Sequence, residues 1–249
     1  MKKILLIATG GTLACGLEDG VLTPSINATS ILNYVPEYKK LCHIDGFQIF
    51  NIGSTSMQPE HWIEIAKAIK KFYDEYDGFI ITHGTDTMAY TSAALSYMIQ
   101  DLSKPIIITG GQKPIEANET DAKLNLLDSI KFSLEGIGGV FVVFNRRVIN
   151  GTRAKKIKSK SYDAFYSINH PYVAKMDDKG IKFMDNTLDR KYKTKTKFDT
   201  SLCTDVLLLK LIPGTKPQLF DYIKNNYKGL VIETFGCGGM PFGEKRNLL

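Results

Sequence analysis

Residues 79–90 read Phe79-Ile80-Ile81-Thr82-His83-Gly84-Thr85-Asp86-Thr87-Met88-Ala89-Tyr90. A short apolar run with β-branched residues comes first, a glycine follows, and the segment beyond it contains Ala and Met and lacks helix breakers. This order predicts a buried strand, a tight turn and the start of a helix. The turn would place Thr85, Asp86 and Thr87 beside the first free N–H groups of that helix, where negative charge is stabilised.

The polar residues of this turn allow two interpretations. Hydroxyl and carboxylate groups at a helix N-terminus suit acyl-group chemistry or the binding of a carboxylate. Asp86 or Thr87 could instead only cap the helix, which is the common use of such residues. Taken alone, the motif favours the cap, because short motifs often match by chance.

Strands and helices alternate on both sides of this stretch. The expected strands are Ile4–Ala8, Phe47–Ile52, Phe79–Thr82, Pro105–Thr109 and Gly139–Asn145. The expected helices are Asn27–Tyr34, Pro59–Tyr73, Met88–Ile99 and one that opens near Asn118, which could cap it. The segment Leu13–Pro24 is expected to be irregular. Such alternation predicts an α/β fold with a doubly wound parallel sheet.

Four of the expected strands end in similar turns. Each combines glycine with a hydroxyl or amide side chain: Gly10-Gly11-Thr12, Gly53-Ser54-Thr55, Gly84-Thr85-Asp86 and Gly110-Gly111-Gln112. In parallel α/β sheets, ligands bind beyond the carboxyl ends of the strands. The four turns therefore predict a pocket for a polar small molecule, with threonine nucleophile candidates and backbone N–H donors.

A threonine nucleophile needs a group that takes its proton. A lysine with a lowered pKa or a tyrosinate could do so. Lys155 and Lys156 follow the strand that ends at Asn145 and are candidates, although lysines more often remain solvated at the surface. The histidines have no partner at metal-ligand spacing and are interpreted as structural or surface residues, so no metal or cofactor is expected: His43, His61, His83 and His170.

Composition narrows the class of protein. The chain has 249 residues and a formal charge of +6, with basic clusters at 155–160 and 190–197. No nucleic-acid motif accompanies these clusters, so a solvated surface or linker is favoured over nucleic-acid binding. No apolar run is long enough to span a membrane, and the one at the N-terminus is cut by two glycines. Four widely spaced cysteines predict free thiols and a cytoplasmic protein.

A second, smaller α/β domain is expected after a Lys- and Thr-rich linker. Its expected elements are a strand at Val206–Leu211, a helix at Pro217–Asn226 and a strand at Leu230–Thr234. The predicted division is a catalytic domain over 1–188, a linker over 189–204 and an incomplete C-terminal domain over 205–249.

Two segments carry a resemblance to a known family. Thr9-Gly10-Gly11-Thr12 and the segment 77–90 resemble the two signatures of the bacterial-type L-asparaginases, and the whole chain most resembles their cytoplasmic type I branch. The resemblance implies hydrolysis of L-asparagine to L-aspartate and ammonia through an acyl-threonine, without a cofactor. It also implies a homodimer or homotetramer whose active site receives groups from a neighbouring C-terminal domain.

The resemblance implies a role for each site residue. Thr12 corresponds to the primary nucleophile, and Thr85, Asp86 and Lys156 to a second triad with Lys156 as base. Lys156 is preferred to Lys155 because the family lysine lies three residues after an arginine, here Arg153. The expected substrate-binding residues are Ser54, Thr55, Asp86 and Gln112.

The chain departs from the family pattern at two places. Family members often carry a tyrosine in the loop after the first signature, whereas Leu13–Leu22 contains none and Val21 stands at its place. Family chains also continue beyond the turn Phe235–Pro241, so a member truncated in its C-terminal domain is expected.

Three alternatives follow. A catalytically impaired paralogue or fragment would bind asparagine or aspartate without turnover. A related amidase subunit that serves amide transfer to charged transfer RNA is disfavoured, because such subunits carry a domain before the first signature. Glutamine could replace asparagine as the substrate, since one methylene typically changes discrimination by only about 1–3 kcal/mol.

Overall fold

The computed structural model describes residues 1–18, 21–184 and 195–240. Contacts divide the chain into a first unit, Met1–Thr200, and a second unit, Ser201–Leu249. The predicted boundary between residues 188 and 189 lies outside the described residues. No helix of the described part is long and apolar enough to cross a membrane.

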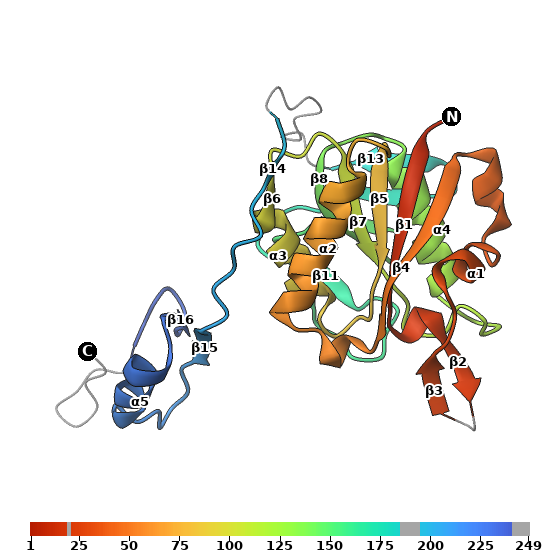
Figure 1. Ribbon diagram of the computed structural model, residues 1–249. Coiled ribbons are helices and arrows are strands. Elements are labelled where there is room, and N and C mark those ends of the chain that lie inside the picture. Colours follow the sequence, from red (N-terminus) through yellow and green to blue (C-terminus); the bar gives the residue numbers. More distant parts are fainter. Residues whose placement is uncertain (19–20, 185–194, 241–249) are drawn as a thin grey trace. The chain divides into compact units, whose positions relative to one another are not determined.

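An eight-stranded sheet forms the centre of the first unit, in the order β13-β12-β9-β8-β7-β5-β1-β4 (Figure 1). Five strands are parallel: β1 (Lys3–Gly10), β4 (His43–Ile52), β5 (Gly78–Thr82), β7 (Pro105–Thr109) and β8 (Gly139–Phe144). Three more extend the sheet antiparallel: β9 (Arg147–Asn150), β12 (Ala174–Asp177) and β13 (Gly180–Phe183). The predicted α/β class is confirmed, and the antiparallel extension adds to it.

Two hydrophobic cores lie on opposite faces of the sheet. Ile4 and Leu6 of β1 belong to one core, with α1 (Ala28–Leu32) and α4 (Ala122–Ser133). Leu5 and Ile7 belong to the other, with α2 (Pro59–Phe72) and α3 (Met88–Met98). Because strand side chains alternate between faces, a strand buried on both sides must be apolar throughout. Helices on both faces make the sheet doubly wound (Figure 1).

The register of the parallel strands brings their carboxyl ends to one edge. Ala8 of β1 pairs with Thr82 of β5, and Thr82 in turn pairs with Thr109 of β7. Gly10, the last residue of β1, pairs with Ile52, the last residue of β4. The four glycine turns follow directly after these strand ends and therefore begin side by side.

Two predicted segments differ in the structure. Leu13–Pro24 is not irregular: a 3-10 turn, η1 (Thr12–Ala14), leads into a hairpin of β2 (Cys15–Glu18) and β3 (Val21–Pro24). The two strands are antiparallel, and Val21 pairs with Glu18. The helix expected near Asn118 begins instead at Ala122, and the residue before it, Asp121, accepts hydrogen bonds from the N–H groups of Gln112 and Lys113.

Shorter elements complete the first unit: η2 (Pro36–Lys40), η3 (Ser54–Ser56), β6 (Ile99–Gln100), β10 (Ala154–Lys156), β11 (Phe165–Ser167) and β14 (Lys197–Phe198). Two-stranded antiparallel pairs form between β10 and β11 and between β6 and β14. The β10–β11 pair carries Lys156, which pairs with Phe165.

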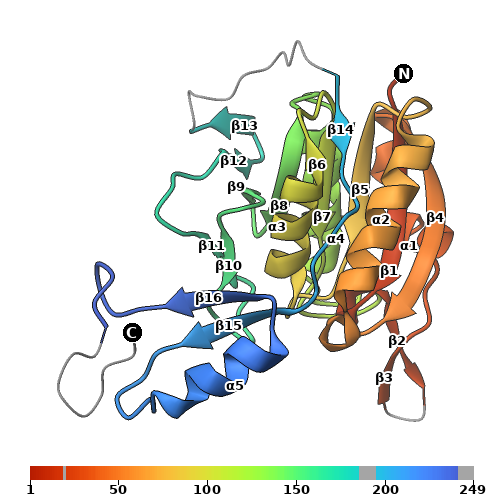
Figure 2. The same ribbon diagram turned by 60° about the vertical axis from the view of Figure 1, so that its left-hand side comes forward.

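The second unit contains β15 (Val206–Lys210), α5 (Gln218–Asn226) and β16 (Gly229–Glu233) (Figure 2). The two strands are parallel, and Leu208 pairs with Val231. Ile223 of α5 is buried, whereas the side chains of Leu208 and Val231 are 57% and 55% exposed. The predicted strand, helix and strand are present within two residues of their expected bounds.

Candidate active site

The turns of the two signatures, Gly10-Gly11-Thr12 and Gly84-Thr85-Asp86, are in direct backbone contact at their glycines. A Cβ built on Gly11 would lie 2.4 Å from the backbone N of Gly84, and the φ angle of Gly11 is +78°. A Cβ built on Gly84 would lie 2.7 Å from Ser54 Oγ in the neighbouring turn. Neither position has room for a side chain, and Gly11 also has a conformation that other residues rarely adopt. The glycines thus bring Thr12, Thr85 and the Ser54 turn to one place.

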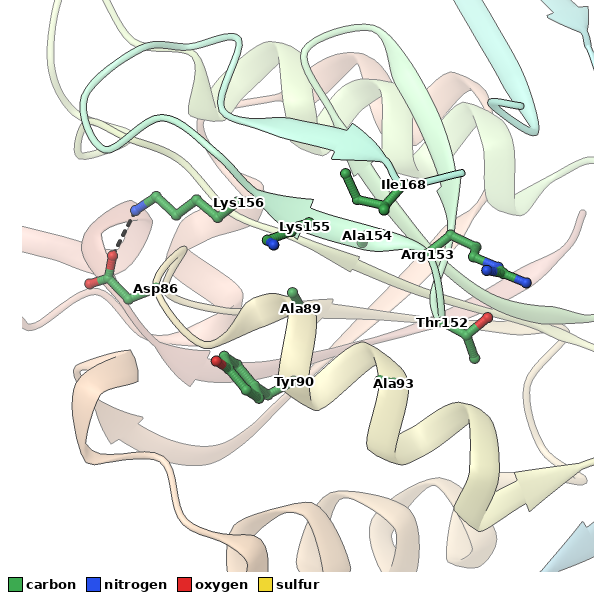
Figure 3. Close-up of a pocket in the computed structure, with 10 residues that line it drawn as sticks. All are labelled: Asp86, Ala89, Tyr90, Ala93, Thr152, Arg153, Ala154, Lys155, Lys156 and Ile168. Atoms are coloured by element: carbon green, nitrogen blue, oxygen red, sulfur yellow. Dashed lines mark hydrogen bonds and ion pairs between the residues drawn. The ribbon is translucent and has the colours of Figure 1, made fainter. Parts of the chain in front are cut away.

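Lys156 joins Thr85 and Asp86. Its Nζ donates to Thr85 Oγ1 at 2.8 Å. It also forms an ion pair with Asp86 Oδ1 at 2.6 Å, which Figure 3 shows as a dashed line. Thr85 is buried, and the side chains of Lys156 and Asp86 are 16% and 59% exposed. The lysine comes from β10 and the other two from the turn after β5, so residues some 70 positions apart in sequence form one cluster.

Only one of the two candidate lysines makes this contact. Along β10, successive side chains point to opposite sides, so Lys155 and Lys156 cannot both face Thr85. Lys155 is exposed and lies on the wall of the neighbouring pocket (Figure 3).

Gln112 is held in place by hydrogen bonds from both ends of its amide. Its Oε1 accepts from Thr85 Oγ1 at 3.2 Å, and its Nε2 donates to the carbonyls of Ser159 and Ser161 at 3.1 and 3.0 Å. Both amide hydrogens therefore have protein partners. Only the carbonyl oxygen of this side chain has a lone pair left for a ligand.

Ser54 connects its own turn to the second signature. Its Oγ accepts from the N–H of Asp86 at 3.2 Å, and its carbonyl accepts from Thr87 Oγ1 at 2.7 Å. Thr87 is the N-cap of α3 but makes no side-chain capping bond, and Asp86 is paired with Lys156. The interpretation of these residues as mere helix caps is therefore wrong. Thr55 is exposed at the adjacent position.

Thr12 begins the 3-10 turn after β1 and is half-buried. Its hydroxyl makes no hydrogen bond to any of the described residues. The backbone contact between Gly11 and Gly84 places it close to the second turn, but no hydrogen bond within the described part joins it to Lys156.

A pocket of about 520 Å³ adjoins the Lys156–Asp86 ion pair (Figure 3). It lies between α3 and β10, and its walls are formed by Asp86, Ala89, Tyr90, Ala93, Thr152, Arg153, Ala154, Lys155, Lys156 and Ile168. Two of the predicted site residues, Asp86 and Lys156, border it, whereas the others lie beyond it. Elsewhere among the described residues, no three His, Cys, Asp or Glu side chains gather as metal ligands would.

Two residues at the start of α4 support the turn Gly110-Gly111-Gln112, and the sequence did not single them out. Asp121 accepts hydrogen bonds from the N–H groups of Gln112 and Lys113 at 3.0 and 3.2 Å. Asn125, one helical turn later, donates to the Gly110 carbonyl at 3.0 Å and accepts from Asn145 N–H at 2.8 Å. The turn Gly110-Gly111-Gln112 is thus fixed to the start of α4.

His83 supports the turn Gly84-Thr85-Asp86 from within the core. It is fully buried, and its ring nitrogens contact the Gly84 carbonyl and Thr91 Oγ1 at 2.7 and 2.8 Å. Burial lowers the pKa of His83 from 6.5 to about 4, so its ring is neutral at physiological pH. Its structural interpretation holds, but its contact is with the backbone of the signature turn itself.

The protein-family comparison matches residues 3–189 to the model described as "Asparaginase, N-terminal". The chain belongs to the asparaginase family. Its sequence is 36% identical over 248 residues to an L-asparaginase of Thermococcus kodakarensis, covering 99% of this chain and 75% of that relative. The predicted family is thereby confirmed.

Solved structures agree with this assignment. The thermostable L-asparaginase from Thermococcus kodakarensis superposes with a TM-score of 0.90 and 34% identity, over 98% of this chain and 74% of that one. L-asparaginase I from Vibrio cholerae gives a TM-score of 0.87 and 29% identity, over 98% of this chain and 75% of that one. The resemblance to the type I branch is therefore seen in the fold as well.

A different class of family member is nearly as similar. A glutamyl-tRNA(Gln) amidotransferase subunit from Pyrococcus horikoshii is 35% identical over 253 residues, which cover 97% of this chain. The chain spans 58% of the length of that relative. Family membership thus indicates amide chemistry, whereas the particular amide must be argued from the site.

Proposed function

We propose that the protein hydrolyses L-asparagine to L-aspartate and ammonia. The observation that carries the proposal is the contact of Lys156 Nζ with Thr85 Oγ1 and Asp86 Oδ1, within a chain of the asparaginase family. A hydroxyl, a carboxylate and a lysine side by side are the groups that activate an oxygen nucleophile for attack on an amide.

In the proposed reaction, Thr12 Oγ attacks the side-chain amide carbon of asparagine. Its proton passes to the leaving nitrogen, the C–N bond breaks, and ammonia departs from an aspartyl ester of Thr12. Lys156 and Thr85 then take a proton from an attacking water. Cleavage of the ester returns the proton to Thr12 and releases aspartate. Lys156 acts as base in its neutral form, and its contact with Asp86 holds Nζ beside Thr85 Oγ1.

The substrate's α-amino and α-carboxylate groups also have candidate partners. The exposed carboxylate of Asp86 suits the ammonium group, and the hydroxyls of Ser54 and Thr55 suit the carboxylate. Gln112 contributes the free lone pair of its Oε1. We further propose a cytoplasmic homodimer or homotetramer, because the four cysteines are free thiols and the family resemblance implies such an oligomer.

The direct test is ammonia release from L-asparagine by the wild-type chain and by Thr12→Ala, Thr85→Ala and Lys156→Met. Each variant is expected to lose activity by at least about 10³-fold, because residues that act as a unit fail together. Lys155→Met is the matched control and should retain activity, because its side chain faces away from Thr85. Equal losses in both lysine variants would contradict the assignment of Lys156.

One observation favours a second function, binding without turnover. The Thr12 hydroxyl has no partner among the described residues that could take its proton. A protein that only binds would be stabilised against unfolding by aspartate but would release no ammonia. Adding L-glutamine to the same assay separates the two amide substrates.

A further inference from the structure

A chain of hydrogen bonds connects two helices to the second signature turn. Trp62 of α2 donates from its indole Nε1 to Thr91 Oγ1 at 2.9 Å. Thr91, on α3, lies 2.8 Å from His83 Nε2, and His83 Nδ1 lies 2.7 Å from the Gly84 carbonyl oxygen. Thr91 and His83 are both fully buried, so no water competes for these bonds.

Only one arrangement of protons fits this series of hydrogen bonds. An indole N–H can only donate, so Thr91 Oγ1 accepts from Trp62 and has its own proton to give to His83 Nε2. A backbone carbonyl can only accept, so His83 Nδ1 carries the ring proton and donates it to Gly84. The ring is then a neutral, fixed donor to one backbone carbonyl.

The orientation of that carbonyl determines the orientation of an N–H. The Gly84 carbonyl and the Thr85 N–H belong to one peptide group, and the peptide bonds of the described residues are not cis. In a trans peptide the C=O and N–H point in opposite directions. Because the carbonyl points at buried His83, the Thr85 N–H points away from it. This N–H makes no hydrogen bond to any described residue.

We propose that His83, Thr91 and Trp62 are positioning residues that hold the Gly84–Thr85 peptide with its N–H toward the reacting amide. The inference rests on the proposed amidohydrolase function. An N–H fixed in this direction stabilises the oxygen that becomes negative when Thr12 attacks, without any reorganisation at that moment. The three side chains never touch substrate and act only through the peptide.

The test is a comparison of Thr91→Val, Thr91→Ser and Thr109→Val with the wild-type chain. Valine keeps the shape of threonine but breaks the link between Trp62 and His83, whereas serine keeps the hydroxyl. Thr109 is the matched control, because it is equally buried but its hydroxyl donates to the Val143 carbonyl at 2.8 Å and takes no part in the hydrogen bonds of Trp62, Thr91 and His83.

Thr91→Val is expected to lower kcat for L-asparagine by at least ~10-fold with KM nearly unchanged, because the lost donor acts on the transition state. Thr91→Ser should restore most of kcat, and Thr109→Val should keep it. A merely structural role would instead lower stability in both valine variants and spare kcat. Wild-type kcat in Thr91→Val, or an equal loss in Thr109→Val, would overturn the proposal.

A second readout does not depend on activity. The 15N shifts of the His83 ring in the wild-type chain should show the proton on Nδ1 and an unprotonated Nε2 from pH 5 upward. A wild-type chain that releases no ammonia would defeat the proposed function alone. The ring shifts would then decide the positioning proposal: a proton on Nδ1 supports it, and a proton on Nε2 overturns it.

Discussion

His83 makes the stability of the protein depend on pH. In the fold its pKa is lowered by burial from 6.5 to about 4, whereas the unfolded chain protonates it below pH 6.5. The unfolded state therefore binds the extra proton first, and stability present above pH 6.5 is lost as the pH falls toward 4. We expect this one residue to lower the free energy of unfolding by about 3 kcal/mol across that window.

Urea unfolding of the wild-type chain and of His83→Gln between pH 7 and pH 4 measures this contribution. Glutamine can donate and accept similar bonds but does not titrate. Its curve of stability against pH should therefore be flatter than that of the wild-type chain. Parallel curves for the two proteins would show that His83 protonates equally in both states.

Asp121 provides a second prediction at the scale of one residue. Asp121→Ala removes the acceptor of the Gln112 and Lys113 N–H groups in a position that is 8% exposed. We expect the free energy of unfolding to fall by about 2–3 kcal/mol, because buried donors lose their partner. Asp178→Ala is the control: its carboxylate pairs with Arg146 but is 92% exposed, so its removal should change little. Equal losses would contradict the argument.

The sequence identified candidate residues whose side chains can themselves take part in catalysis. Thr85 and Asp86 were candidates because they lie in a glycine turn after a buried strand, and the family resemblance selected Lys156 over Lys155. The structure brings the three residues together. His83 and Asp121 could not be assigned their roles, since these consist of contacts with backbone groups elsewhere in the fold. No spacing in the sequence predicts which carbonyl a buried imidazole will meet.

At the scale of elements, the contact between two turns depends on Gly11. Gly11→Ala would push a Cβ to 2.4 Å from the backbone of Gly84 and would add strain of about 1–3 kcal/mol at a φ of +78°. Gly180→Ala is the matched control, because its φ is +135° but nothing lies within 4 Å. Both variants should lose stability in thermal unfolding, and Gly11→Ala should lose more, together with ammonia release. A Gly11→Ala chain with wild-type activity would show that the turns need not touch.

The helices and strands were predictable where a single hydrophobic pattern in the sequence determined them. The strand Pro105–Thr109 has the expected bounds, and the helix from Pro59 begins as expected and ends one residue earlier, at Phe72. An apolar run and an amphipathic period leave little choice at these places. The β2–β3 hairpin was missed, since its pairing gives no clear alternating pattern in Cys15–Glu18. The antiparallel strands beyond β8 were also missed, because each contains only four residues.

At the scale of the whole molecule, the second unit exposes apolar side chains on its two-stranded sheet. Leu208 and Val231 are adjacent across the strands and more than half exposed. Exposed apolar surface promotes association, so Leu208→Lys should reduce concentration-dependent light scattering. Thr204→Lys adds the same charge at an exposed position without removing apolar surface, and should reduce scattering less. Equal reductions in light scattering by the two variants would show that the added charge alone causes the change.

Covalent catalysis by Thr12 is tested by mass spectrometry of the wild-type chain quenched in acid during turnover of L-asparagine. We expect an aspartyl ester on the peptide that contains Thr12 and no ester in Thr12→Ala. The ester should accumulate in Lys156→Met, which lacks the base for its hydrolysis. Ammonia release without any ester, or with an ester only on Thr85, would show that Thr12 is not the nucleophile.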